Sequence, residues 1–512
     1  MSNLAYRQSK IQEKRKQTPW RDFVMEICSR STLSYYRTKE GISRYPNSHR
    51  VGKLISYKDF FDRNVLQWLP SWDFLQDFIS LMEIESLPIM LHYDQNENSD
   101  FSDQVQSSKN CYLSTAVIKD CENVLYSLSV KEWSKNIYSS TMVRDQSENI
   151  YESMGIINSS NIFFSKWIFN SSFVYTSYNL INCHYCIRCH DLENKKYYVD
   201  NNEVSKEVFQ NELKMIQQQN TTLPMNNDLF SMNFQCNWLQ RWILNYKIAN
   251  GNNLVMVWSH EWNKNMYDIF TAWSPYGSDF YAVMGVWGSD NIYCTMNTTW
   301  SSHIFYSVFM VSCSFCLWCI GLKNKSYCIL NKQYSKEERY EKVDEIFWQM
   351  EKEWTLGEFF PWSMCPFYFN DTAAYLIDNS FTKEEVTAKW YLWRDEPIKV
   401  DIPEWAKVVK TSELGQYEWR KVGEEGVIAR RRHDDVAIHW TTKNDEWDPS
   451  TSVGMTQSWY IDPEILNVII QDEAWNVYRI VKMEYDFILK HWLPLPRKHR
   501  LDRMKENFTI AS

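Results

Sequence analysis

Two clusters of cysteines are the residues whose type and spacing best suit chemistry. Each cluster has the spacing Cys-x-x-Cys-x-x-Cys; the first starts at residue 183 and the second at residue 313. The six candidate metal ligands are Cys183, Cys186, Cys189, Cys313, Cys316 and Cys319. Thiolates bind zinc and iron–sulfur clusters. A structural zinc site takes four ligands, so His184 or His190 would complete the first cluster and Cys328 the second.

The same cysteines also suit the interior of a repeat, because cysteine is a small residue that is often buried. Single cysteines at Cys111 and Cys121, in the same part of the chain, favour this second interpretation. Zinc is the cofactor we expect if the clusters bind one, and both interpretations stay open.

No catalytic constellation stands out elsewhere. The chain has no Gly-x-Gly-x-x-Gly motif, Walker loop, His-Glu-x-x-His motif or Gly-x-Ser-x-Gly motif. His433 and His439 lie beside Asp434 and Asp435, and we interpret this stretch as a solvated loop. We therefore predict no catalytic residues and expect a protein that is not an enzyme.

Two basic patches lie near the C-terminus, Arg430–Arg432 and Arg497–Lys505. Such patches can contact the phosphates of nucleic acid. The formal net charge of the chain is −9, however, and proteins that coat nucleic acid generally are strongly basic. Nucleic acid is therefore a secondary expectation for the partner.

The cysteine clusters close two runs of short repeats with a nearly constant period. In the first run asparagines recur once per repeat, at Asn110, Asn123, Asn136, Asn149 and Asn161. Two short strands and two tight turns fit in one such repeat, and stacked strands lie about 4.8 Å apart. Like side chains in successive coils then form columns, and stacked asparagines can hydrogen-bond along the column. The pattern predicts a β-solenoid.

A second run repeats the end of the first at a constant offset. Asn291-Ile292 follows Asn161-Ile162 at the same offset that separates the two cysteine clusters, and Ser335-Lys336-Glu337 follows Ser205-Lys206-Glu207 at that offset too. This regularity indicates internal duplication. We predict a mainly β protein, a β-solenoid (β-helix) of duplicated 12–13-residue coils with flanking helices and a small C-terminal α+β module.

The patterns divide the chain into seven segments. They are an N-terminal helical capping region (1–100), the first β-solenoid array (101–200), a helix and loop insert (201–244), the second array (245–330), a helical region (331–396), a linker (397–410) and the C-terminal module (411–512). Within them, helices are expected at 206–219, at 335–354, from an N-cap at Thr382, and at 477–492.

The N-terminus is polar and basic, without the apolar core of a signal peptide, and no uncharged apolar stretch is long enough to span a membrane. We expect a cytoplasmic protein that does not contact membranes. In that compartment thirteen cysteines would be reduced or bound to metal rather than paired in disulfides.

Several stretches resemble an uncharacterised family, the cysteine-rich "NCY-repeat" proteins of uncultivated small-genome bacteria. They are Ser108–Leu113, Gly321–Lys325, Asn331–Glu338, Gly357–Pro361, Trp393–Glu396, Tyr478–Ile480 and Leu493–Arg497, spread over roughly residues 60–512. The resemblance implies the repeat architecture and no reaction. Members of that family carry more cysteines than this chain, so the resemblance gives no support for a zinc ribbon at the C-terminus.

Tryptophan is over-represented and glycine is scarce, with 25 and 13 copies in 512 residues. Average glycine usage is about 7%. Trp354, Trp390 and Trp475 stand where the resemblance implies glycine. Some bacteria of this kind read the codon UGA as glycine, so we hypothesise that part of the tryptophan excess is glycine in the native protein.

The leading expectation for function is a repeat scaffold that binds a protein partner along a face of the solenoid. The alternatives are a metal-binding protein with zinc or an iron–sulfur cluster in the cysteine clusters, and a β-solenoid that binds nucleic acid or carbohydrate. The carbohydrate alternative requires clustered carboxylates on one face, whereas the repeats mostly offer serine and asparagine.

Overall fold

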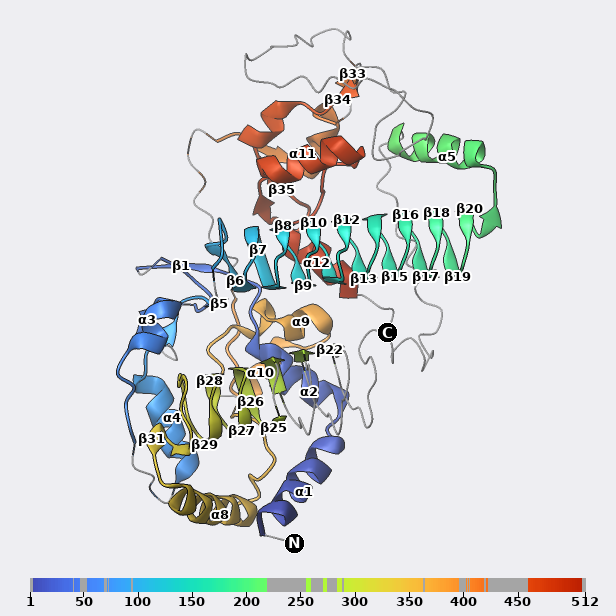
Figure 1. Ribbon diagram of the computed structural model, residues 1–512. Helices are drawn as coiled ribbons and strands as arrows, with labels where there is room; N and C mark the ends of the chain where they lie inside the picture. The colour runs from blue at the N-terminus through green and yellow to red at the C-terminus, as the bar shows by residue number, and fades with distance from the viewer. Residues whose placement is uncertain are drawn as a thin grey trace. The chain divides into compact units, whose positions relative to one another are not determined.

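A computed structural model describes most of the chain (Figure 1). The described residues are 3–39, 41–46, 53–68, 71, 73–93, 95–218, 255–258, 270–273, 283–287, 290–361, 364–395, 402, 404, 406–418, 420–421 and 459–508. The chain folds as two compact units. One unit comprises residues 1–106 and 232–395, and the other comprises residues 107–231 and 396–512. Each unit contains a β-solenoid array, which confirms the predicted fold class.

The first array is a stack of coils with two parallel strands per coil. Its strands are β7 (Lys109–Ile118), β8 (Glu122–Leu125), β9 (Leu128–Lys131), β10 (Lys135–Tyr138), β11 (Thr141–Arg144), β12 (Glu148–Tyr151), β13 (Met154–Ile157), β14 (Ser160–Phe163), β15 (Lys166–Phe169), β16 (Ser172–Tyr175), β17 (Tyr178–Ile181), β18 (His184–Ile187), β19 (His190–Glu193), β20 (Lys196–Val199) and β21 (Asn202–Glu203). Each strand pairs with the strand one coil away, as β12 does with β10 and β14.

Four side chains per coil fill the narrow interior, because every third residue points inward. In the coil that starts at Glu148 they are Ile150, Ser153, Ile156 and Ser159, exposed by 4% at most. Two interior columns are therefore mainly aliphatic and two consist mainly of serine, with cysteine in the first and last coils. The serine columns are hydrogen-bonded along the stack, since the Ser153 amide donates to Oγ of Ser140 at 3.1 Å and the same contact recurs in the next coil.

The asparagine column forms the predicted ladder. Asn110, Asn123, Asn136, Asn149 and Asn161 are joined by four amide-to-amide hydrogen bonds of 2.9–3.1 Å. Ile137 pairs with Ile150, and Ile150 pairs with Ile162, in the parallel register. Equivalent side chains of consecutive coils therefore stack as expected.

A left-handed residue recurs at every third position of the array. In one coil Asn149, Glu152, Gly155 and Asn158 have φ of 58°, 44°, 70° and 47°. This conformation costs a non-glycine residue about 1–2 kcal/mol. The ladder bonds offset this cost, and asparagine tolerates the conformation better than most residues.

The same unit contains a helix after the array and the C-terminal module. Their elements are α5 (Lys206–Gln218), β32 (Val408–Lys410), η4 (Thr411–Gln416), β33 (Arg420–Lys421), β34 (Trp459–Tyr460), η5 (Pro463–Asn467), β35 (Ile469–Gln471), β36 (Val477–Tyr478), α11 (Lys482–His491) and α12 (Arg500–Phe508). The module packs on the array through Phe487, whose ring stacks on Tyr138 with centroids 4.2 Å apart. On α5, Phe209 meets Tyr185 edge to face.

Two boundary predictions differ from the structure here. The helix expected at 477–492 begins at Lys482, because Val477 and Tyr478 pair antiparallel with β35 instead. In the segment 397–410, Val408–Lys410 form a strand that pairs with β35, and most of the remainder lies outside the described residues. The helix expected from Lys206 is confirmed as α5.

The other unit contains the second array, whose later strands lie at a constant sequence offset from those of the first array. Its strands are β22 (Val255–Trp258), β23 (Phe270–Trp273), β24 (Val283–Trp287), β25 (Asp290–Tyr293), β26 (Thr295–Thr299), β27 (Ser302–Phe305), β28 (Val308–Val311), β29 (Ser314–Leu317), β30 (Cys328–Ile329) and β31 (Lys332–Gln333). The offset between the cysteine clusters also separates the start of β29 at Ser314 from that of β18 at His184. It separates the start of α8 at Lys336 from that of α5 at Lys206 as well.

This unit also contains helices and short strands outside the second array. They are α1 (Asn3–Lys16), α2 (Trp20–Glu26), η1 (Cys28–Arg30), β1 (Tyr36–Thr38), β2 (Gly41–Ser43), β3 (Leu54–Ile55), α3 (Tyr57–Asp62), α4 (Phe74–Ile84), β4 (Leu87–Pro88), β5 (His92–Tyr93), β6 (Phe101–Gln106), α8 (Lys336–Lys352), η3 (Phe369–Asp371), α9 (Ala373–Ile377) and α10 (Lys383–Ala388). α8 and α10 confirm two expected helices: Ser335 caps α8 in a capping box, and Thr382 caps α10.

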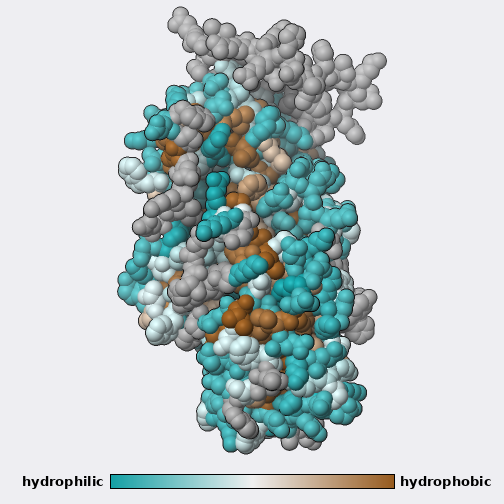
Figure 2. Space-filling view, turned by 90° about the vertical axis from the view of Figure 1, so that its left-hand side faces the viewer, coloured by the Kyte–Doolittle hydropathy of each residue, from teal (hydrophilic) through white to brown (hydrophobic). Residues whose placement is uncertain are grey.

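The N-terminal helices pack against the second array through aromatic side chains. The ring of Phe78 on α4 lies 5.0 Å from that of Trp318, and the ring of Phe60 on α3 lies 5.6 Å from that of Phe309. Figure 2 faces the side on which α3 and α4 lie in Figure 1 and shows hydrophobic patches among hydrophilic surface. No helix in the described parts of the chain combines the length and apolarity that crossing a bilayer requires.

Trp354, Trp390 and Trp475 share an unusual backbone conformation. Their φ values are 61°, 62° and 66°, and their side chains are exposed by 85%, 72% and 78%. Trp354 and Trp390 follow the last residues of α8 and α10, where the next amide bonds back to the helix, as Thr355 does to the Met350 carbonyl at 2.9 Å. Glycine is the usual residue at such a left-handed helix end.

Candidate functional site

The predicted metal ligands occupy the interior columns of the last coils. Cys183 and Cys189 continue the two serine columns, because their amides donate to Oγ of Ser171 and Ser177 at 2.9 Å. Cys186 takes the aliphatic position that pairs with Val174 one coil earlier. The second cluster has the same arrangement, since the amides of Cys313 and Cys319 donate to serine Oγ atoms one coil earlier.

The structure brings the thiols of each cluster together. The Cys186 thiol interacts with those of Cys183 and Cys189, and the interaction with Cys186 lowers the pKa of Cys183 to about 7. In the second cluster the Cys316 thiol interacts with that of Cys319 and with that of Cys328, which the sequence had named as a fourth ligand. Burial raises the pKa of the Cys313 thiol to about 11.

The thiols do not form a ready metal site. In the described part of the chain, no group of three or more histidine, cysteine, aspartate or glutamate side chains is arranged to hold a metal ion. The sulfur atoms of Cys183 and Cys189 donate to backbone carbonyls at 3.2–3.4 Å. His184 hydrogen-bonds to Ser172, and His190 lies beside Asp191 at 3.2 Å. Metal binding by the clusters stays a prediction.

The C-terminal basic patch is engaged within its own unit. Arg497 pairs with Glu418 at 2.5 Å and donates to the Thr411 carbonyl. Arg503 is buried and pairs with Glu484 at 2.9 Å. These guanidinium groups are therefore occupied by carboxylates of the chain. The other patch, Arg430–Arg432, and the group around His433 and His439 lie outside the described residues.

Sequence reasoning missed a carboxyl pair on the first array. Burial, and then a hydrogen bond with Asp145, raise the pKa of Glu132 to about 7. Lys119 pairs with Glu132 at 2.6 Å. Glu132 and Asp145 are one repeat period apart, so the repeat period could have predicted that their side chains lie in contact. A carboxyl group that stays protonated near neutral pH suits proton donation. None of the cavities described below includes it.

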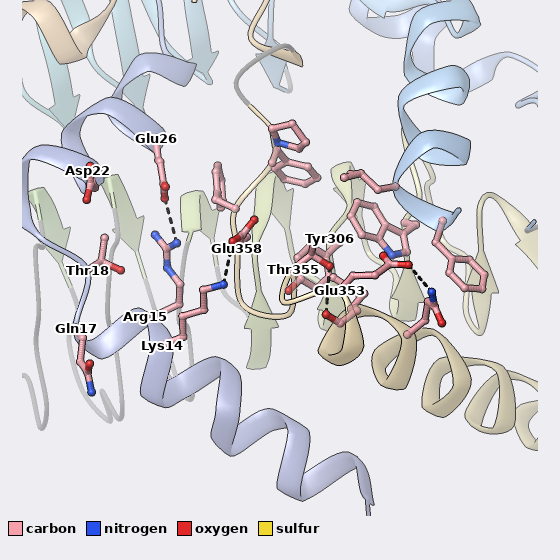
Figure 3. Close-up of a pocket in the computed structure, with 18 of the residues that line it drawn as sticks. Lys14, Arg15, Gln17, Thr18, Asp22, Glu26, Tyr306, Glu353, Thr355 and Glu358 are labelled. Atoms are coloured by element: carbon pink, nitrogen blue, oxygen red, sulfur yellow. Dashed lines mark hydrogen bonds and ion pairs between the residues drawn. The ribbon is translucent and has the colours of Figure 1, made fainter. Parts of the chain in front are cut away.

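A cavity of about 490 Å³ lies beside the second array, and we call it the Tyr306 cavity (Figure 3). Its aromatic walls are Phe74, Tyr306, Trp318, Phe359 and Phe360. The lining also includes Trp390, one of the three positions where glycine is hypothesised in the native protein. Tyr306 and Trp318 are neighbours in one column of the array, and their rings stack 4.7 Å apart. The Tyr306 hydroxyl accepts from the Gly357 amide at 2.8 Å, and burial raises the pKa of this tyrosine.

Charged residues from three helices line the same cavity. Lys14 of α1 pairs with Glu358 at 3.1 Å, and Arg15 pairs with Glu26 of α2 at 3.0 Å, as Figure 3 shows. Glu353 lies at the end of α8, where its carboxylate accepts from the Gln349 amide. Among the described residues it forms no ion pair.

The cavity combines aromatic walls, charged groups and one unsatisfied donor. Its described lining contains no cysteine, histidine or serine. Trp318 is 2% exposed, and its indole N–H has no acceptor among the described residues. Aromatic rings attract cations, and so do a carboxylate and the negative end of a helix. The arrangement therefore favours a ligand with an apolar body, a positive charge and a hydrogen-bond acceptor.

Comparisons with known proteins add no assignment, since no protein-family model, curated protein or solved structure matches the chain.

Proposed function

We propose that this chain is a non-enzymatic repeat scaffold that binds a protein partner, and that a basic side chain of the partner enters the Tyr306 cavity. The supporting observation is the Glu353 carboxylate, which has no cation partner among the described residues and lies at the C-terminal end of the 17-residue helix α8 beside aromatic walls. A lysine or arginine side chain offers both an apolar stem and a charge.

The mixture of walls and charges favours a protein over a small metabolite. Lys14 and Arg15 are already neutralised by Glu358 and Glu26. Asp22, the other acid of the lining, lies 3.6 Å from Nζ of Lys389. Glu353 is therefore the acid that selects one cation, and the aromatic rings favour burial of the stem of that side chain. Backbone carbonyls of a bound segment would supply the acceptor that the Trp318 indole lacks.

Two subsidiary inferences accompany this proposal. The constant offset between β18 and β29, and between α5 and α8, supports an origin by internal duplication. Every cysteine in the described part of the chain is a buried free thiol, which supports a reducing compartment such as the cytoplasm.

The test compares capture of partners by the wild type and by two variants. Met350→Trp fills the cavity from α8, and Glu353→Gln removes the free carboxylate while keeping its shape. Glu345→Gln is the matched control, because Glu345 is an exposed acid on α8 that does not line the cavity. Each bait is incubated with native-host lysate, and bound proteins are quantified and cross-linked.

We expect a protein that binds the wild type and Glu345→Gln, is lost with both cavity variants, and cross-links through a segment containing lysine or arginine. Equal capture by all four baits would refute the proposal, as would a cross-linked segment without a basic residue.

A further inference from the structure

A second cavity in the same unit is lined by two deeply buried arginines. It has a volume of about 280 Å³, and Arg30 and Arg44 reach it from η1 and from the end of β2. Their side chains are 2% and 1% exposed. We call it the Arg30 cavity. A buried charge is costly unless an opposite charge accompanies it, so each arginine needs a counter-ion.

Arg44 has a counter-ion within the chain. Its Nη1 atom lies 3.0 Å from Oδ2 of Asp103, which is itself fully buried. Oδ1 of Asp103 accepts from the Leu91 amide at 2.8 Å. The Nε atom of Arg44 has no hydrogen-bond acceptor among the described residues. Arg44 is therefore neutralised but keeps an unused donor.

Arg30 has no carboxylate partner among the described residues. Its Nη2 atom donates to the carbonyls of Phe360 and Pro361 at 2.8 and 3.0 Å, and its Nε donates to the Glu26 carbonyl at 3.3 Å. Its Nη1 atom is buried without an acceptor in the described parts of the chain. The nearby acid Glu26 is already paired with Arg15. Among the described residues, this positive charge thus meets backbone carbonyls and the Phe359 ring, 6.0 Å away, but no carboxylate.

The rest of the lining is mainly apolar. Its walls include Met82, Met296, Met364, Val308, Phe309 and Phe367. Methionine side chains are flexible and polarizable, so they adapt to hydrocarbon of different shapes. Glu83 is the only acid in the described lining and is exposed. A hydrated inorganic ion would leave these walls without a partner.

We propose that the Arg30 cavity binds a small apolar carboxylate, with the carboxylate accepting from Arg30 and Arg44 and the hydrocarbon lying among the methionines. Guanidinium groups match carboxylates in geometry and charge. Such a ligand uses the unpaired donors and supplies the missing negative charge. This site is separate from the Tyr306 cavity and does not depend on the proposed function.

The probe is octanoate, measured by isothermal titration calorimetry and by the shift in melting temperature of the full chain. Acetate tests the head group alone, 1-octanol tests the chain alone, and inorganic phosphate tests a different anion. We expect octanoate to bind at least about tenfold more tightly than any of these, since one charge-assisted hydrogen bond contributes about that factor. If no octanoate binding is seen, or if phosphate binds more tightly, the proposal fails.

Two variants locate the site. Arg30→Met removes the charge, and Met82→Trp fills the cavity from α4 while Arg30 stays in place. Arg21→Met is the control, because Arg21 is a partly exposed, ion-paired arginine outside the cavity lining. Both cavity variants should weaken octanoate at least about tenfold, and the control should not.

Should Arg30→Met fail to give the wild-type circular dichroism spectrum, Met82→Trp decides alone. Octanoate binding that survives in folded Met82→Trp would overturn the assignment.

Discussion

The indole ring of Trp167 lies against the backbone of Gly155 one coil earlier, so a Cβ atom built on Gly155 would approach Cε3 of Trp167 to 1.9 Å. Gly155 also has a φ of 70°, which disfavours any residue with a side chain. It is the only glycine in the first array from Lys109 to Val199, and the contact explains why serine or asparagine cannot replace it there.

Replacing Gly155 by alanine is therefore expected to destabilise the protein by about 1–3 kcal/mol, because the new methyl group overpacks against Trp167. Urea unfolding measures the change. Gly415→Ala is the matched control, since Gly415 has no positive φ and open space around its Cα. Equal losses of stability in the two variants would contradict the clash.

The cysteine columns predict unequal effects of serine substitution within one cluster. Cys183→Ser and Cys189→Ser should each change stability by less than about 1 kcal/mol, because serine occupies the equivalent positions in earlier coils. Cys186→Ser should cost about 1–3 kcal/mol, because it places a hydroxyl in an aliphatic column.

Metal analysis of the purified wild type distinguishes the alternative. Near-stoichiometric zinc or iron, with a large loss of stability in all three variants, would show that the clusters are metal sites.

The amide ladder should contribute measurably to stability. Asn149→Ala removes two ladder bonds and puts alanine at a φ of 58°, so we expect a loss of about 1–3 kcal/mol in denaturant unfolding. Asn149→Gly keeps the backbone freedom and should recover part of that loss. Asn182→Ala is the control and should cost less, because Asn182 is exposed and donates to Asn194 in a separate column. If Asn149→Ala were neutral, the ladder would be dispensable.

Acid should weaken the C-terminal module through His491. Burial lowers the pKa of His491 from 6.5 to about 3, with Lys490 adding to the effect. Between these pH values the unfolded chain binds a proton that the folded chain excludes, so the contribution of His491 to stability falls as the pH drops from about 6.5 towards 3.

The difference in unfolding free energy between the wild type and His491→Leu isolates the contribution of His491 to the pH dependence of stability. Burial raises the pKa of Glu418 and Glu152, so these acids oppose the trend in both proteins. We expect the stability of the wild type, relative to His491→Leu, to decrease from pH 7 to pH 4 in denaturant titrations. A constant difference would show that His491 does not titrate in this way.

The exposed left-handed tryptophans support the hypothesis that glycine occupies Trp354, Trp390 and Trp475 in the native protein. Each Trp→Gly replacement should stabilise the recombinant chain by about 1 kcal/mol, because glycine adopts this conformation without strain. Trp348→Gly, in the middle of α8, should destabilise it. Peptide mass spectrometry of the native protein tests the hypothesis directly, and intact tryptophan at residues 390 and 475 would end it.

Much of the array could be predicted because its signal is a repeat. The spacing from Asn110 to Asn161 gave the coil length, and stacking at that length follows from strand geometry. The cysteine triplets were recognised as one unit, and the structure brings their thiols together. Their position in the serine columns could also have been predicted, because Ser171 and Cys183 are one period apart.

Other features depend on contacts without a local pattern. The sequence did not predict the left-handed residue at every third position, because residues such as serine, glutamate and phenylalanine at these positions do not usually adopt that conformation. The two cavities combine α1, α4, α8 and coil residues that are hundreds of positions apart in the chain. Nothing in the sequence around Arg30 or Arg44 indicates that their side chains line the same hollow.

The end of the first array has a consequence for self-association. The amide of His190 donates to Oδ1 of Asn201, and β21 turns back to pair antiparallel with β20. The backbone of His190 and the outer edge of β20 are thus already hydrogen-bonded at this end, which leaves less of the edge for templated growth. A chain cut after Val199 would present a bare parallel edge, and filaments rather than monomers are the expected product.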